Sequence, residues 1–135
     1  MSIIGFNFLS FEAKVDEEHL MGTIDVKNTP LIEDVKEKKL DFLGPNEAVA
    51  IKFRFTSSYG KAGEIKMTGE IICKTDARQV MKRWDKEKKL DDDLVLEILN
   101  FLLNKCMIKS VELADALRLP PPLQFPHIVK EDKKD

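Results

Sequence analysis

The chain has 135 residues, of which 43% are hydrophobic and 34% charged, and its formal net charge is −2. This length and composition predict one globular domain with a single core, and the balanced charge excludes the basic surface that makes nucleic acid the default partner. The N-terminal segment reaches Glu12 too early for a signal peptide, and no apolar run approaches the length of a membrane span, so we expect a cytoplasmic protein.

The first half of the sequence alternates apolar and polar residues, a pattern typical of antiparallel strands with one buried face. Four strands are predicted in this way, over residues 3–15, 22–28, 48–56 and 64–74. A shorter strand over 38–43 is also expected, before Gly44-Pro45. The apolar phase of the first strand slips between Phe8 and Leu9, which indicates a β-bulge. The glycine-containing loop before the last strand predicts a hairpin.

The second half of the sequence changes to the helical period. Asp76 is placed to cap a helix with one apolar face, made of Ala77, Val80, Met81 and Trp84. A charged linker is expected over 86–93, because its aspartates favour the start of a following helix.

A longer helix is predicted over 94–107, because its apolar residues form one broad face. These residues are Leu94, Val95, Ile98, Leu99, Leu102, Leu103 and Cys106. Ser110 is placed to cap a last short helix over 110–118. Strands followed by helices indicate an α+β fold, with an antiparallel sheet of four to five strands and two to three C-terminal helices packed on one face.

Motifs for catalysis are missing from the sequence. There is no GxSxG, HExxH, P-loop or GxGxxG pattern, and His19 and His127 lie near opposite ends of the chain. Cys73 and Cys106 are 33 positions apart, with no CxxC pair and no histidine nearby, which argues against a zinc site and a disulfide framework. We therefore expect a protein that is not an enzyme and that uses no cofactor or metal.

One segment, "LLNKCMIKSVELADALRLP", resembles a helix-turn-helix in its sequence pattern. Its second helix would enter the major groove of DNA, and this helix would present Glu112, Asp115 and Arg118. Two acidic side chains and one basic side chain are poorly suited to binding in the groove, because the DNA phosphates repel carboxylates. A capped helical corner is therefore favoured over a DNA-binding motif, which stays open as a minor alternative.

The segment "LRLPPPLQFPHI" at 117–128 combines three consecutive prolines with apolar residues. Proline fixes φ and donates no N–H, so the prolines predict a stiff polyproline II stretch that ends the last helix. Leu119, Leu123, Phe125 and Ile128 would be costly to leave in water. We expect this arm to pack on its own chain, to cover a groove or to dock on another subunit.

The order of an antiparallel sheet, a long helix and a proline-flanked apolar segment resembles the SecB family of export chaperones. The segment "EKKLDFLGPNEAVAIKFRFTSS" is similar to the family's second and third strands, and "AGEIKMTGEIICK" to the strand that pairs with them. The segments "LEILNFLLNKCM" and "LPPPLQFP" resemble its main helix and the connector that follows. The likeness spans roughly residues 33–128. An extra short helix at 110–118, and the absence of a long helix after the connector, depart from the family pattern.

The resemblance implies a SecB-like domain over 1–129, followed by a charged disordered tail at 130–135. It also implies an ATP-independent holdase that keeps non-native polypeptides in an apolar groove, and a homo-oligomer, either a dimer or a tetramer. The groove would be lined by Phe6, Phe8, Phe11, Met67, Trp84, Leu119, Leu123 and Phe125. For each of these residues an ordinary place in the core is the alternative. A second hypothesis is an oligomeric adaptor with one specific protein partner.

Overall fold

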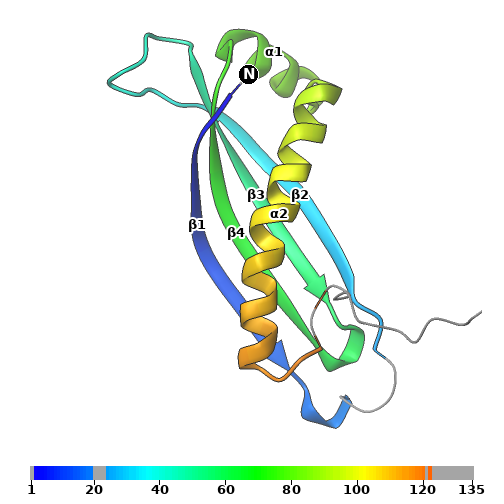
Figure 1. Cartoon of the computed structure of the whole chain (residues 1–135). Helices are drawn as coiled ribbons and strands as arrows, with labels where there is room; N and C mark the ends of the chain where they lie inside the picture. The colour runs from blue at the N-terminus through cyan, green and yellow to red at the C-terminus, as the bar shows by residue number, and fades with distance from the viewer. Residues whose placement is uncertain (1, 20–23, 121, 123–135) are drawn as a thin grey trace, which may run out of the picture.

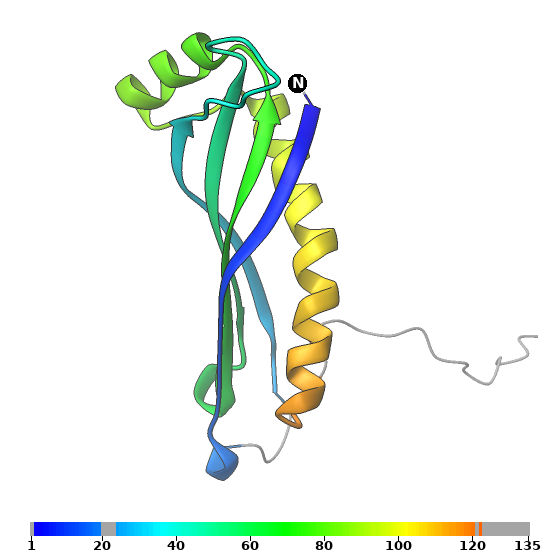
Figure 2. The same ribbon diagram turned by 90° about the vertical axis from the view of Figure 1, so that its left-hand side faces the viewer.

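The computed structural model describes residues 2–19, 24–120 and 122. Four strands form one antiparallel sheet in the order β1-β4-β3-β2, with β1 at Ser2–Val15, β2 at Lys27–Glu37, β3 at Ala48–Ser58 and β4 at Gly63–Lys74. Two helices follow, α1 at Ala77–Glu87 and α2 at Asp92–Ala116. The long helix α2 runs along one face of the sheet, and α1 lies at the end of the sheet where the chain begins (Figures 1 and 2). The predicted α+β fold is confirmed.

The β3–β4 hairpin forms the centre of the sheet and of the core. Its inward side chains are fully buried, because β2 flanks β3, β1 flanks β4, and α2 covers the inward face of the hairpin. Eight of them are 0% exposed: Val49, Ile51, Phe53, Phe55, Ile65, Met67, Ile71 and Cys73. Among the alternate residues of β3, Lys52 and Arg54 are exposed, whereas Ala48 and Ala50 are buried. Burial of each large apolar side chain contributes roughly 1.5–3 kcal/mol, so this alternation fixes the register of the sheet.

The first strand contains the bulge that its sequence predicts. The pairing of β1 with β4 shifts between Phe8 and Ser10, and it also shifts between Ile3 and Gly5. Because each bulge inserts one extra residue, the apolar side chains return to the inward face after it.

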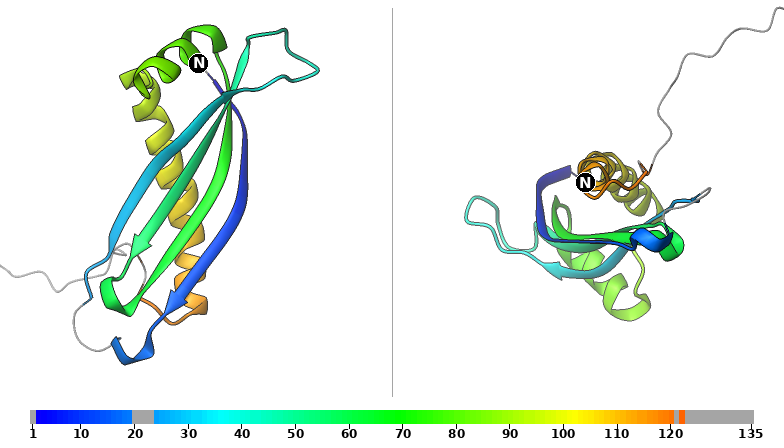
Figure 3. Two further views of the ribbon diagram at one scale, coloured as in Figure 1. Left: turned by 180° about the vertical axis from the view of Figure 1, so that it is seen from behind. Right: turned by 90° about the horizontal axis from the view of Figure 1, so that it is seen from below.

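Two strand predictions are wrong. The second strand occupies 27–37, whereas the prediction was 22–28, of which residues 22 and 23 lie outside the described residues. The pattern of this strand is hard to recognise because it includes Pro30 and is interrupted by a bulge between Ile32 and Asp34. Pro30 is tolerated because β2 is an edge strand. The short strand expected over 38–43 is absent from the described chain. Residues 38–47 form a loop that projects from the end of the sheet (Figures 1 and 3).

The first helix begins as predicted, since the carboxylate of Asp76 accepts a hydrogen bond from the N–H of Gln79 at 3.4 Å. It ends at Lys88, which has the left-handed φ of 54°. Leu90 is buried in the linker that leads to α2. No helix in the described ranges combines the length and the apolar character needed to cross a membrane.

The prediction of a last short helix that begins at Ser110 is wrong, because α2 continues through this residue to Ala116. Every fourth residue of α2 faces the sheet, and these residues are Leu94, Ile98, Leu102, Cys106, Ser110 and Ala114. Ser110 is therefore an inward side chain that is 0% exposed, not a cap. With no turn at this position, the two-helix corner of a helix-turn-helix does not form.

The prolines follow a Schellman motif, which explains why α2 ends abruptly. Arg118 has the left-handed φ of 58°. The N–H of Leu119 donates to the carbonyl of Ala114 at 2.9 Å, and the N–H of Arg118 donates to the carbonyl of Asp115 at 3.2 Å. These are the two hydrogen bonds that define the motif. The chain then turns back toward the sheet, and Leu119 is buried.

Candidate functional site

The two flanks of α2 differ from its buried stripe. Leu102 points into the core, and successive residues of a helix are about 100° apart. Phe101 and Leu103 therefore lie on opposite flanks of α2. Phe101 meets Phe6 of β1 at a ring-centroid distance of 5.3 Å, so the flank with Leu103 faces β2.

On the β1 side, aromatic rings form a partly exposed cluster, which we call the β1-side aromatic surface (Phe6, Phe8, Phe11 and Phe101). Ring centroids are 4.8 Å apart for Phe6 and Phe8, and 4.9 Å apart for Phe8 and Phe11. Phe11 is 46% exposed. Aromatic side chains offer a large apolar area with few rotatable bonds, which suits them to binding apolar segments.

Two lysines of α2 lie over this surface. The ammonium of Lys105 is 5.9 Å from the ring centroid of Phe101, and that of Lys109 is 5.6 Å from that of Phe11. The ammonium of Lys109 also contacts the carboxylate of Glu112 at 2.8 Å. The contacts of the two lysines with the phenylalanine rings are cation–π interactions, each worth about 0.5–1 kcal/mol at exposed sites. The aromatic surface therefore has a basic border.

On the β2 side, the inward face of the sheet is incompletely covered. The inward side chains Asn28, Pro30 and Ile32 of β2 are only half-buried, whereas Val35 further along the strand and the inward side chains of β3 are buried. The opposite flank of α2 is likewise half-buried, and Leu103 is 37% exposed. We call this region the β2-side margin (Asn28, Pro30, Ile32, Leu99, Leu103 and Met107). It is a second apolar surface beside the same helix.

The connector (the described residues 117–120 and 122) contacts this margin at the end of the sheet opposite α1. The hydroxyl of Tyr59 donates to the carbonyl of Pro120 at 2.7 Å, and the side-chain amide of Asn28 donates to the carbonyl of Pro122 at 2.8 Å. The hydroxyl of Ser57 donates to the amide oxygen of Asn28 at 2.7 Å. Burial raises the pKa of Tyr59 to about 12, so this phenol keeps its proton at physiological pH.

The predicted groove residues are distributed over three places. Phe6, Phe8 and Phe11 come together on the β1-side aromatic surface. Met67 pairs with Phe11 in the sheet but is 0% exposed, so in this conformation it is a core residue.

The remaining predicted residues lie elsewhere. Trp84 is 8% exposed in α1, at the opposite end of the sheet from the connector. Leu119 is buried in the connector. Leu123 and Phe125 lie outside the described residues, as does the expected tail at 130–135.

Several residues of these surfaces were not predicted from the sequence. Asn28 and Pro30 were missed because their segment was not recognised as a strand over its whole length. Ser57 continues the inward phase of Phe53 and Phe55, and a polar residue at such a position is a signal that a buried hydrogen bond is present. Phe101 lies outside the apolar face predicted for its helix, and the sequence does not indicate its partner Phe6.

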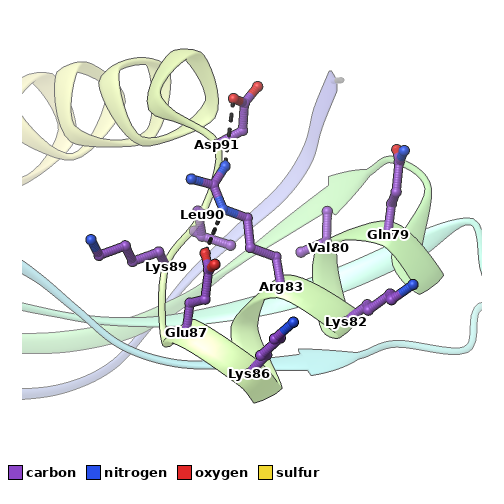
Figure 4. A pocket seen from close by; sticks show the side chains of 9 residues that line it. All are labelled: Gln79, Val80, Lys82, Arg83, Lys86, Glu87, Lys89, Leu90 and Asp91. Atoms are coloured by element: carbon purple, nitrogen blue, oxygen red, sulfur yellow. Dashed lines mark hydrogen bonds and ion pairs between the residues drawn. The ribbon is translucent and has the colours of Figure 1, made fainter.

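A cavity of 650 Å³ lies elsewhere, between α1 and the start of α2 (Figure 4). Lys82, Lys86 and Lys89 line it and are exposed. Arg83 is already paired, at 3.3 Å with Glu87 and at 3.8 Å with Asp91. Apolar lining with a few convergent polar groups is typical of small-molecule sites, whereas six of the nine residues that line this recess are charged.

Reactive groups are scarce in the described chain. In the part of the chain that the structure describes, no three His, Cys, Asp or Glu side chains gather as metal ligands. Burial, together with the nearby carboxylate of Glu97, raises the pKa of the Cys73 thiol to about 11. Burial raises that of Cys106 to about 12. Both thiols are therefore protonated and poor nucleophiles at neutral pH.

Comparison with known proteins gives a structural likeness and no sequence match. No protein-family model and no curated protein sequence matches the chain. Among solved structures, the Mycobacterium tuberculosis Rv1957 SecB-like chaperone, in complex with a ChAD peptide from the Rv1956 HigA1 antitoxin, superposes with a TM-score of 0.54. Its sequence identity is 12%, and the alignment covers 95% of this chain and 87% of that chain. The four-stranded sheet and its two following helices thus form a SecB-like fold.

Proposed function

We propose that the protein is a non-enzymatic, ATP-independent holdase that binds extended apolar segments of non-native polypeptides. The observation that carries the proposal is the half-exposed apolar surface on each side of α2. One surface is aromatic, and the other is an open margin of the core. The SecB-like neighbour, which was solved with a peptide from another protein, supports this function through the shared fold.

The physical basis is the loose specificity of apolar contact. Burial of apolar area is favourable by roughly 25 cal/mol per Å² and has no directional requirement. Thioether and aromatic side chains can repack against different partners. Met107 and Phe11 lie on these surfaces, so different segments can be accommodated with modest affinity.

The test is suppression of client aggregation. We expect the purified protein to reduce light scattering by a chemically denatured client during its refolding. The variant Phe11→Ser should suppress aggregation less, while Leu31→Ser serves as a matched control. Leu31 is 50% exposed, close to the 46% of Phe11, but it lies on the outer face of the sheet. Unchanged scattering at several-fold molar excess of the wild-type protein would show that it is not a holdase.

A second candidate is an adaptor with one specific partner. The neighbour's complex with a peptide from a single named protein favours this alternative. A pull-down from lysate separates the two functions, since an adaptor should retain one stoichiometric protein and a holdase should retain many.

We also propose that the protein assembles as a dimer or tetramer. Leu96 and Ile108 on α2 are 63% and 65% exposed, and apolar side chains at such exposure favour burial against another chain. A solution mass equal to one chain at micromolar concentration would contradict this assembly.

A further inference from the structure

The polar contacts that hold the connector belong to a hydrogen-bonded cluster at the end of the sheet. They join three separate elements to one segment, because Asn28 lies on β2, Ser57 on β3 and Ser110 on α2. The hydroxyls of Ser57 and Ser110 are 3.5 Å apart, and both residues are 0% exposed. Such buried groups are costly to leave unpaired. The cluster therefore favours a single position of the connector, in which these polar groups are paired.

Within the connector, Pro120 and Pro122 can be held only through their carbonyls, because proline has no N–H. Two of these carbonyls are bound, that of Pro120 by Tyr59 and that of Pro122 by Asn28. Proline restricts the backbone, so these contacts at Pro120 and Pro122 restrain the described part of the connector. Leu119 and Pro122 are buried as a result.

We infer that Asn28, Ser57 and Tyr59 are positioning residues for polypeptide binding, and we call them the proline anchor. By fixing Leu119 and Pro122, they close one end of the β2-side margin and keep that surface in its binding conformation. A preorganised surface loses less conformational entropy when it binds. This inference rests on the proposed function and adds the residues that keep the β2-side margin in place for binding.

The test uses variants that remove only the contacts to the connector. Tyr59→Phe removes the hydroxyl that binds Pro120. Asn28→Asp keeps the size of the side chain and its acceptor for Ser57, but it offers no N–H to Pro122. The double variant Ser10→Ala/Thr68→Ala is the control, because it removes a side-chain hydrogen bond on the outer face of the same sheet.

Affinity is measured with a fluorescent, reduced and alkylated α-lactalbumin as the unfolded probe, well below the melting temperature of every variant. Each anchor variant should bind the probe roughly two- to tenfold more weakly, as expected for one lost hydrogen bond. The control should bind like the wild type. A merely structural role of the anchor would lower the melting temperature without changing the affinity of the folded protein.

A second measurement follows the connector itself, with no client present. Trypsin should cleave the Arg118–Leu119 bond several-fold faster in both anchor variants, because Arg118 is exposed and Leu119 must leave the core. Unchanged cleavage would show that the anchor does not fix the connector. Faster cleavage with unchanged affinity would show that the connector is not part of the binding surface. A wild-type protein that binds no probe would refute the proposed function itself.

Discussion

The ring of Phe6 stacks on the ring of Phe53, with centroids 5.5 Å apart and an angle of 11° between the ring planes. The stack links the edge strand β1 to the centre of the sheet, across the intervening strand β4. It is possible because the residue of β4 that pairs with Phe53 is Gly69. A Cβ atom at this position would collide with the ring of Phe53 and with the carbonyl oxygen of Asn7.

We therefore expect Gly69→Ala to destabilise the protein. Overpacking of a well-filled core costs about 1–3 kcal/mol, and here one of the clashing groups is backbone, which cannot rotate away. Chemical denaturation should show the loss. Gly60→Ala is the comparison, because a Cβ at Gly60 meets nothing within 4 Å, although its φ of 62° still disfavours alanine. A Gly69→Ala protein as stable as the wild type would mean that the sheet shifts to accommodate the methyl group.

Arg118→Gly should stabilise the protein. Arg118 holds a left-handed φ of 58° at the Schellman position, where glycine carries no steric penalty. The expected gain in the free energy of unfolding is about 1 kcal/mol. The variant Arg118→Val should instead lose stability, because a β-branched residue is strained in this conformation. Equal unfolding midpoints for glycine and valine would contradict the described end of α2.

Phe101→Ala should weaken both stability and client binding, since Phe101 packs on Phe6 and belongs to the β1-side aromatic surface. The cost in stability is expected at the low end of the ~3–5 kcal/mol that a fully buried phenylalanine loses, because this ring is only half-buried. Leu31→Ala, on the outer face of β2, is the control. Because Leu31 is 50% exposed, the stability of this variant should stay within about 0.5 kcal/mol of wild type.

Stability should fall at alkaline pH. The pKa of Cys73 is raised from 9.0 to about 11 and that of Cys106 from 9.0 to about 12, because both thiols are buried. The unfolded chain then releases these protons at lower pH than the folded chain does. The resulting contribution is complete below pH 9.0 and is lost as pH rises through about 11 to 12. Denaturation at a series of pH values measures this loss.

The control for this pH dependence is the double variant Cys73→Ala/Cys106→Ala. It should show a smaller decrease in the free energy of unfolding above pH 9.0, the ordinary pKa of the two thiols. Tyr59 should contribute the rest, since its pKa is raised from 10.0 to about 12 by burial. A decrease of the same size with and without the cysteines would assign the alkaline loss to other groups.

The sequence by itself determined the elements whose pattern follows from their own burial. The alternation in β3 and β4 predicts the central hairpin, and the phase slip at Phe8 predicts the bulge of β1. Asp76 marks the start of α1, and the prolines mark the end of α2. In each case the signal is local, because side-chain periodicity and backbone restriction depend only on neighbouring residues.

Tertiary structure alone decided which residues meet. Ser110 looks like a helix cap in the sequence, yet it is an inward residue of α2 opposite Ser57, because the sheet covers the helix to its end. Pro30 makes the edge strand β2 hard to recognise in the sequence, and this strand forms because it pairs with β3. Phe6, Phe8 and Phe11 share one surface with Phe101, far along the chain, and Asn28 reaches Pro122. Such contacts depend on how the helix lies across a twisted sheet, which no local pattern encodes.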